Sequence, residues 1–337
     1  MKYEELQELI KLAQTPKIAV AFVKTNSFIS DPCNAKILCS ISGGADSDIM
    51  LDIVHRLDTD KKVHYVFFDT GIEMDAQKRQ IKFLEQKYGI EIERLKPKLP
   101  VGASVIKHGY PFYSKIFSEY IGRLQKHGFK WEDKPFDELY AEYPKCKAAL
   151  RWWCNMLHTE GGKFMQSEIG SAPYMKEFMI KNPPTFNISR TCCDDAKKQP
   201  AHSIESQYDL VMTGIRKAEG GSRSTSIKNC FAQTKHGNFY YPIFWFSDED
   251  KKEYEKTFKV THSDAYTVYG CKRTGCAGCP FGSRFENEIE MLEKYEPKLA
   301  VVVKNIFNPS HEYMRKYREF KKEMNDAKRR NEHGTVY

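Results

Sequence analysis

Four cysteines in two compact pairs are the residues of this chain best suited to chemistry. Cys192 and Cys193 are adjacent, and Cys276 and Cys279 form a Cys-x-x-Cys motif nearer the end. Zinc sites usually leave two to four residues between paired ligands, whereas an iron–sulfur cluster spreads its ligands over several irons. The adjacent pair therefore favours a [4Fe–4S] cluster. Zinc held by the same four thiolates, or buried structural cysteines without metal, are the alternatives.

A glycine turn after an apolar run is the second chemical feature. Residues 36–41 form the apolar run, helical spacing of apolar residues follows the turn, and the turn itself reads Ser42, Gly43, Gly44, Ala45, Asp46, Ser47. Glycines bring backbone N–H groups close to an anion, and a helix N-terminus adds partial positive charge. The two serines can donate hydrogen bonds, and Asp46 can cap the helix or help to hold Mg²⁺. This context favours a phosphate-binding loop over a plain turn, although the Walker and dinucleotide patterns are both absent.

The bulk composition describes an ordinary soluble chain with a basic surface. Among 337 residues, 53 are Lys or Arg and 45 are Asp or Glu, which gives a net charge of +8. This excess indicates either a solvated lysine-rich surface or attraction to polyanions such as nucleotides and nucleic acid. The chain opens with an amphipathic helix rather than a secretory signal, and no apolar run approaches the roughly 18 residues of a membrane span. We expect a cytoplasmic protein with no membrane partner, in which ten cysteines indicate metal, catalysis or burial.

Alternating strand and helix patterns predict the fold. Strands are expected at 36–41, 63–68, 90–95, 208–212 and 239–245, with helices after the first two. This order predicts an α/β fold with a doubly wound, mainly parallel five-stranded sheet. The predicted core combines residues 1–100 and 206–260. Residues 101–205 are a mostly helical insertion, bearing substrate contacts or serving as a structural extension, and 261–337 hold the second cysteine pair and C-terminal helices.

The turn resembles the pyrophosphate-binding loop, or PP-loop, of the adenine-nucleotide α-hydrolase superfamily. Within that superfamily the chain resembles the phosphoadenosine phosphosulfate reductase family. Three further blocks agree with the resemblance: Phe68-Asp69-Thr70-Gly71; Thr213-Gly214-Ile215-Arg216 through Glu219 and Arg223; and Arg190 with Cys192, Cys193, Lys197 and Lys198. The resemblance implies an α-hydrolase-like fold with an adenine nucleotide, ATP or an adenylyl sulfate, at the carboxyl edge of the sheet.

The resemblance also implies roles for individual residues. Asp46, Lys197 and Arg216 are the catalytic candidates. The nucleotide contacts would come from Ser42, Gly43, Gly44, Ala45, Asp46, Ser47, Asp69, Thr70, Gly71, Gly214, Arg216 and Arg223. Two departures from the family pattern matter. Ala45 stands where the family's loop has a lysine, and Lys197, Lys198, Arg216 or Arg223 are the candidates to supply the missing positive charge. Gly220-Gly221 place Ser222 one position away from the serine of the family pattern.

The cysteine pattern resembles the [4Fe–4S] site of adenylyl-sulfate reductases and related sulfur-transfer enzymes, with Cys192, Cys193, Cys276 and Cys279 as ligands. Small residues around the second pair are expected to leave backbone N–H groups for cluster sulfurs. The implied activity is ATP-dependent sulfur transfer through an adenylylated substrate, as in tRNA-thiolation and DNA-phosphorothioation enzymes. Nucleic acid is the favoured substrate class, and a cysteine desulfurase is a candidate sulfur donor.

Two other functions are open. A reductase of adenylyl sulfate or phosphoadenylyl sulfate would need a mobile nucleophilic thiol, which the family carries on a C-terminal tail. No cysteine follows Cys279, so Cys271 or another thiol would have to substitute. A nucleotide-binding iron–sulfur module without turnover is the third function, and Ala45 is the feature that favours it.

Overall fold

A computed structural model describes residues 2–157, 168–220, 226–281 and 284–333. The chain divides into two compact units, each with its own hydrophobic core. The first unit comprises Met1–Lys98 and Ala196–Cys276, and the second comprises Leu99–Asp195 and Ala277–Tyr337. Residues 261–276, which the sequence analysis grouped with the C-terminal segment, thus belong to the first unit.

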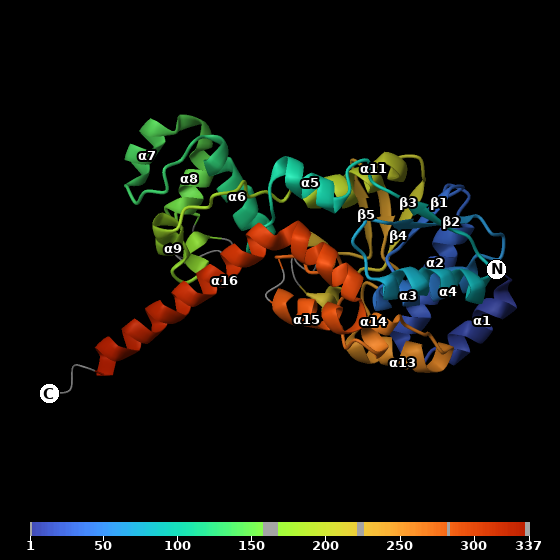
Figure 1. Cartoon of the computed structure of the whole chain (residues 1–337). Helices are drawn as coiled ribbons and strands as arrows, with labels where there is room; N and C mark the ends of the chain where they lie inside the picture. The colour runs from blue at the N-terminus through green and yellow to red at the C-terminus, as the bar shows by residue number, and fades with distance from the viewer. Residues whose placement is uncertain (1, 158–167, 221–225, 282–283, 334–337) are drawn as a thin grey trace. The chain divides into compact units, whose positions relative to one another are not determined.

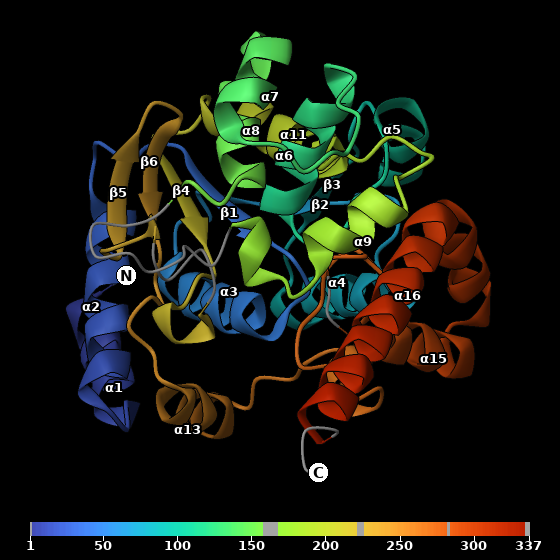
Figure 2. The ribbon, with the colours of Figure 1, turned by 90° about the vertical axis from the view of Figure 1, so that its left-hand side faces the viewer.

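One six-stranded sheet organises the first unit, with the strand order β3-β2-β1-β4-β6-β5 (Figure 2). The strands are β1 (Ile37–Ile41), β2 (Val63–Phe68), β3 (Ile92–Leu95), β4 (Leu210–Thr213), β5 (Phe231–Thr234) and β6 (Gly237–Tyr240). Every neighbouring pair is parallel except β5 with β6. The predicted mainly parallel α/β sheet is confirmed, but the predicted five strands omitted β5. This edge strand has four residues and none of them is buried, so it lacks the apolar run that marks the others.

Helices cover both faces of the sheet. The helices of the first unit are α1 (Tyr3–Leu12), α2 (Pro16–Ser30), α3 (Ala45–Leu57), α4 (Asp75–Tyr88), α11 (Gln199–Glu205), α13 (Asp248–Phe258) and α14 (Asp264–Thr267). Because side chains alternate along a strand, Cys39 of β1 enters the large core formed with α2, α3, α4 and α13. Leu38 faces the other way and joins a small cluster beside Ile204 of α11. This two-sided cover agrees with the doubly wound prediction.

The strand order reverses between β1 and β4, and this reversal positions the candidate site. From β1 the chain continues outward through β2 and β3, and it then returns to the other side of β1 as β4 (Figure 1). Connections from the two strands therefore leave in opposite directions and open a crevice at the carboxyl ends, where ligands of doubly wound folds bind. The glycine turn follows β1, and Gly214 follows β4.

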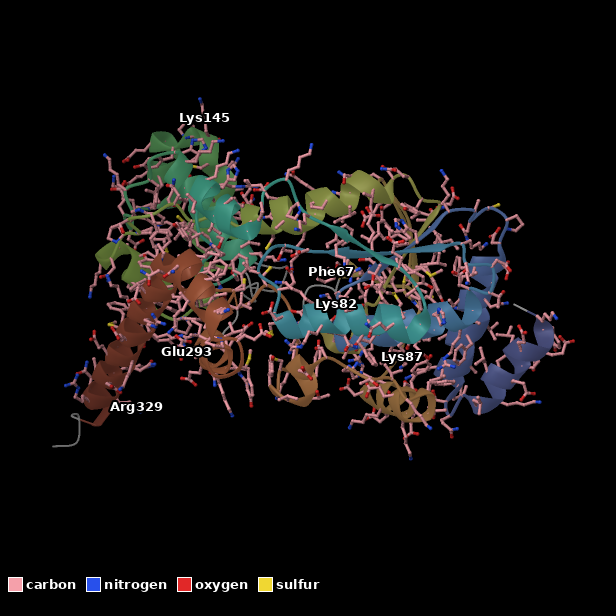
Figure 3. All side chains as sticks on the ribbon, turned by 45° about the vertical axis from the view of Figure 1, so that its right-hand side comes forward. Phe67, Lys82, Lys87, Lys145, Glu293 and Arg329 are labelled. Carbon is pink, nitrogen blue, oxygen red and sulfur yellow. The ribbon has the colours of Figure 1, made fainter. Side chains whose placement is uncertain are left out.

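The described part of the second unit is helical. Its helices are α5 (Val101–His108), α6 (Lys115–Lys126), α7 (Phe136–Glu142), α8 (Lys147–Trp153), α9 (Met175–Lys181), α10 (Thr191–Cys193), α15 (Phe285–Tyr295) and α16 (Pro297–His333). Aromatic side chains dominate its core, and Trp152 and Trp153 are fully buried. None of the helices within the described ranges has the length and apolarity to cross a bilayer. The long α16 is strongly polar, and Arg329 lies near its end (Figure 3).

Candidate functional site

The turn between β1 and α3 is shaped by its own hydrogen bonds. Gly43 has a φ of +64°, which only glycine adopts without strain. The Ser42 N–H donates to Ser47 Oγ at 2.9 Å, and the Gly44 N–H donates to Ser42 Oγ at 3.3 Å. Helix α3 begins at Ala45 without a side-chain cap at its preceding residue. The N-terminus of a helix favours an anion, because its first N–H groups have no partner within the helix.

Glycine is also required where β4 approaches this turn. A Cβ on Gly214 would lie 2.9 Å from the Asp46 carbonyl oxygen and 3.0 Å from both the N and Cα atoms of Ser47. These are backbone atoms, so any side chain would push the loop away from β4. Gly44 is similarly confined, since a Cβ there would lie 3.3 Å from the Tyr266 hydroxyl. The loop is therefore fixed by neighbours on two sides.

A cavity of about 390 Å³ opens beside the loop. This volume lies within the range of small-molecule sites. The loop supplies Ser42, Gly44, Ala45, Asp46 and Ser47, and polar residues of other elements complete the wall: Glu73, Gln77, Lys197, Thr213, Gly214, Arg216, Glu219, Lys251, Tyr266, Lys272, Arg273, Thr274 and Gly275. Five of the lining side chains are cationic and three are carboxylates. The excess of positive charge and the helix N-terminus both favour an anionic ligand.

Asp46 is held by two of these cations. Its Oδ2 accepts a hydrogen bond from Arg216 Nε at 2.9 Å, and its Oδ1 accepts one from Lys251 Nζ at 2.9 Å. Burial disfavours the charge on Arg216, but Asp46 and Asp248 outweigh burial and raise the pKa of its guanidinium. Arg216 thus orients Asp46. The carboxylate is already compensated by two cations, so this arrangement gives no support to a Mg²⁺ ligand at Asp46, and the metal stays a prediction.

A second polar group lies two positions further into α3. Asp48 is fully buried, and its Oδ2 lies 2.9 Å from His262 Nδ1 and 3.1 Å from Gln80 Nε2. His262 Nε2 lies 2.8 Å from Glu255 Oε1. Burial opposes the charge on His262, but its bonds to Asp48 and Glu255 outweigh burial and raise its pKa to about 9. A protonated imidazole therefore joins α3 to α13 at neutral pH and holds the segment that leads to Tyr266.

The structure brings together most of the predicted loop and cation contacts. Ser42, Gly44, Ala45, Asp46, Ser47, Lys197, Gly214 and Arg216 all line the cavity. Gly43 packs behind the loop against Gln77, and Lys198 is not among the described lining residues. Arg223 and Ser222 lie outside the described residues.

Residues 69–71, which follow β2, were predicted to contact the nucleotide, but they do not line the described cavity. Asp69, Thr70 and Gly71 are not among the described residues that line the cavity, whereas Phe68 and Glu73 on either side of them are. The Asp69 carboxylate accepts a hydrogen bond from the Gly71 N–H at 3.0 Å. Thr70 is buried and donates its hydroxyl to Glu73. This block therefore shapes the cavity wall through its own hydrogen bonds.

Sequence reasoning missed Lys251, Tyr266, Lys272 and Arg273. Lys251 gave no signal, because it lies in the densely charged helix α13, which resembles any solvated helix. Lys272 and Arg273 lie four and three positions before Cys276 of the second cysteine pair, and two cations so close to a motif were a usable signal. Of these residues, Lys251, Lys272 and Arg273 are cationic. They supply positive charge beside a loop in which Ala45 stands where the family pattern has a lysine.

The cysteines are divided between the two units. Cys276 is the last residue of the first unit, and its Sγ lies 3.8 Å from Thr70 Oγ1. Cys192, Cys193 and Cys279 belong to the second unit, where the first is buried and the other two are half-buried. Across the described ranges, no three His, Cys, Asp or Glu side chains gather as a metal-binding group. The [4Fe–4S] site therefore stays a prediction, supported by the chemistry of its four thiols.

Comparisons with known proteins place part of the chain in a family. Residues 36–128 match the family model of the phosphoadenosine phosphosulfate reductase domain. No curated protein matches the chain significantly.

Three solved structures are similar at low identity. A phosphoadenylyl-sulfate reductase from Candida auris, in a phosphate complex, is 13% identical, with 82% of this chain and 96% of that chain covered and a TM-score of 0.42. An NH3-dependent NAD synthetase from Campylobacter jejuni, in complex with nitrate, is 11% identical, with coverages of 91% and 96% and a TM-score of 0.33. A U34-tRNA thiolase from Methanococcus maripaludis, with its [4Fe–4S] cluster, is 14% identical, with coverages of 90% and 79% and a TM-score of 0.33. We base no functional inference on these similarities, because all three TM-scores are below 0.5.

The family match covers β1, the glycine turn, α3 and β2, which are the elements that build one side of the cavity. It confirms the family that the Ser42–Ser47 loop and the block after β2 indicated. The part of the chain that builds this side of the cavity, residues 36–128, is thus similar to the phosphoadenosine phosphosulfate reductase domain family.

Proposed function

We propose that this protein is an ATP-dependent sulfur-transfer enzyme that adenylylates its substrate at the loop site. The observation that carries the proposal is the cavity at the N-terminus of α3, which combines loop N–H groups with five lining cations. A triphosphate is the ligand whose charge matches this wall. Phosphate transfer is catalysed mainly by positioning and by stabilising developing negative charge, and both need such groups.

The proposed first step is nucleotidyl transfer. A substrate oxygen attacks the α-phosphorus of ATP, the new P–O bond forms, and the α–β phosphoanhydride bond breaks to release pyrophosphate. Lys197, Lys272 and Arg273 would bind the phosphates, while Arg216 and Lys251 keep Asp46 in place beside them. In the second step a sulfur nucleophile displaces AMP from the adenylylated substrate.

The cysteine centre belongs to the same proposal. Cys192, Cys193, Cys276 and Cys279 would hold a [4Fe–4S] cluster, which supplies sulfur-handling chemistry when it is bound. Nucleic acid is the proposed substrate class, supported by the net charge of +8, and a cysteine desulfurase is the proposed sulfur donor. A cytoplasmic location follows from the ten cysteines, which suit a reducing compartment.

Reduction of adenylyl sulfate or phosphoadenylyl sulfate is the second candidate function. The observation that favours it is the family match itself, since the matching model is that of a reductase domain. This reaction requires a thiol that attacks the sulfur of the nucleotide. Cys271 is the candidate, because it directly precedes the cavity-lining residues 272–275 and is not one of the four predicted cluster ligands.

Product analysis distinguishes the candidates. We expect pyrophosphate release from ATP in the presence of the acceptor nucleic acid, and no sulfite from adenylyl sulfate with a thiol reductant. Lys272→Met should reduce pyrophosphate release about tenfold, because one phosphate contact is lost, at roughly 1.4 kcal/mol. Lys82→Met is the matched control, since this exposed lysine of α4 is not among the described cavity residues (Figure 3).

The opposite products would change the assignment. Sulfite release without pyrophosphate would establish the reductase. Tight ATP binding with neither product would leave the nucleotide-binding module without turnover, and equal losses in Lys272→Met and Lys82→Met would refute the assignment of the cavity as the phosphate site.

A further inference from the structure

The second cysteine pair contains a turn with no room for a side chain. Gly278, between Cys276 and Cys279, has a φ of +60°. A Cβ at this position would lie 2.1 Å from Val303 Cγ1 of α16. The left-handed backbone and the close helix both require glycine. The turn is therefore packed directly against α16 at the residue that precedes Cys279.

The backbone of Gly278 is bonded to a side chain of α16. Its carbonyl oxygen accepts a hydrogen bond from His311 Nε2 at 2.9 Å. Helix α16 thus holds this peptide of the cysteine motif through its acceptor and also packs against it through Val303. The peptide that precedes Cys279 is therefore fixed at two points by one helix.

His311 is itself held in one orientation. Its side chain is only 2% exposed, and its ring stacks on Phe285 with centroids 4.5 Å apart and an interplanar angle of 5°. Burial lowers the pKa of His311, so the ring is neutral and its proton lies on Nε2, toward the Gly278 carbonyl. A stacked, buried ring with one fixed proton is a rigid hydrogen-bond donor. A side chain that only filled space in the core would not need this donor.

We propose that His311 is a positioning residue that fixes the backbone of Cys279 for ligation of the metal centre. Hydrogen bonds from outside the ligand set commonly orient metal ligands and tune their affinity. Here they act on the peptide that precedes the thiol. This inference rests on the proposed cysteine site, and it has a consequence in the metal-free protein: the Cys279 thiol should be less accessible while the turn is held.

The first test measures the metal-free, full-length chain. Alkylation of Cys279 by iodoacetamide is followed by mass spectrometry, with the exposed Cys33 as internal reference. His311→Leu removes the donor, and we expect alkylation to accelerate roughly fivefold to tenfold, the effect of losing one buried hydrogen bond. His311→Gln retains an N–H donor and should stay near the parent rate.

Ser310→Ala is the matched control for structural damage. Ser310 is the neighbour of His311 in α16, is fully buried and donates to the Pro111 carbonyl, so this variant also loses one buried hydrogen bond. It should leave the alkylation rate of Cys279 unchanged. If Ser310→Ala accelerates alkylation as much as His311→Leu does, or if His311→Leu does not accelerate it, the positioning role is refuted.

The second test measures iron and acid-labile sulfide in anaerobic preparations of the same variants, together with the reduction potential of any cluster. We expect His311→Leu to lose iron severalfold faster to a chelator than the parent, Ser310→Ala and His311→Gln. Parent-like iron retention in His311→Leu would overturn the inference. A parent that binds no iron would refute the proposed cluster alone, since the alkylation rates decide the positioning role independently.

Discussion

Raising the pH should weaken the bridge that His262 forms beside the loop. Its imidazole lies between Asp48 of α3 and Glu255 of α13, and Lys251 of α13 and Tyr266 of α14 are nearby ionisable groups. The pKa of His262 is raised from 6.5 to about 9. Because the pKa of His262 is higher in the folded state than in the unfolded state, protonation of His262 stabilises the fold. This stabilisation is fully present below the unfolded pKa of 6.5 and is lost as the pH rises through the folded pKa of about 9.

The magnitude follows from the size of this shift. Each pKa unit corresponds to about 1.4 kcal/mol, so the bridge contributes on the order of 3 kcal/mol at pH 6.5 and little above pH 9. Burial raises the pKa of Asp48 to about 6. Asp48 therefore ionises mostly below this window, and its own effect does not obscure that of His262.

Urea unfolding at intervals between pH 6.5 and 9.5, followed by circular dichroism, tests this reasoning. Subtracting the His262→Gln variant from the parent removes the contributions that other groups make to both. We expect the difference in unfolding free energy to be largest at pH 6.5 and to decline by about 2–3 kcal/mol toward pH 9.5. Asp48→Asn should flatten the profile in the same way. A difference between parent and His262→Gln that stays constant with pH would refute the ion bridge.

Three further predictions concern the loop, the core and the cysteines. Gly214→Ala should weaken ATP binding about tenfold or more in calorimetry, because the new Cβ displaces the loop backbone, whereas Lys82→Ala, at an exposed residue outside the described cavity wall, should not; equal affinities would disprove the close approach. Asp52→Ala should lower the free energy of unfolding in urea by about 3–5 kcal/mol, since Arg56, Tyr88 and Tyr254 all donate hydrogen bonds to this buried carboxylate. Asp60 is exposed, so Asp60→Ala should cause little change, and similar losses in both variants would contradict the network. Cys193→Ala and Cys276→Ala should each reduce iron and sulfide in an anaerobic preparation, while Cys33→Ala should not, and parent-like iron in the first two would remove these cysteines from the ligand set.

Local sequence signals were sufficient for most of the sheet. The apolar runs of β1, β2 and β4 and the glycine turn after β1 are patterns of neighbouring residues, so they could be predicted without knowledge of the fold. The edge strand β5 could not, because its half-exposed residues carry no buried face to identify it. Loop identity was likewise local, since the φ of +64° at Gly43 is a requirement of the turn itself.

The remainder of the site comes from residues distant in sequence. Lys251 bonds to Asp46 from α13, and His262 bonds to Asp48 from the segment before α14. Neither residue belongs to a motif, and each lies in a stretch where charged residues are common. Their importance appears only when α13 and α14 pack beside α3.

Sequence by itself determined the α/β pattern, the loop and the four thiols, because each depends on residue type and short-range spacing. Tertiary structure alone decided that Arg216 and Lys251 neutralise Asp46, that Gly214 must lack a side chain, and that His311 holds Gly278. These relations depend on which helices pack together and on whether a buried donor finds an acceptor. Packing and hydrogen-bond satisfaction are properties of the whole fold, so no local pattern could have shown them.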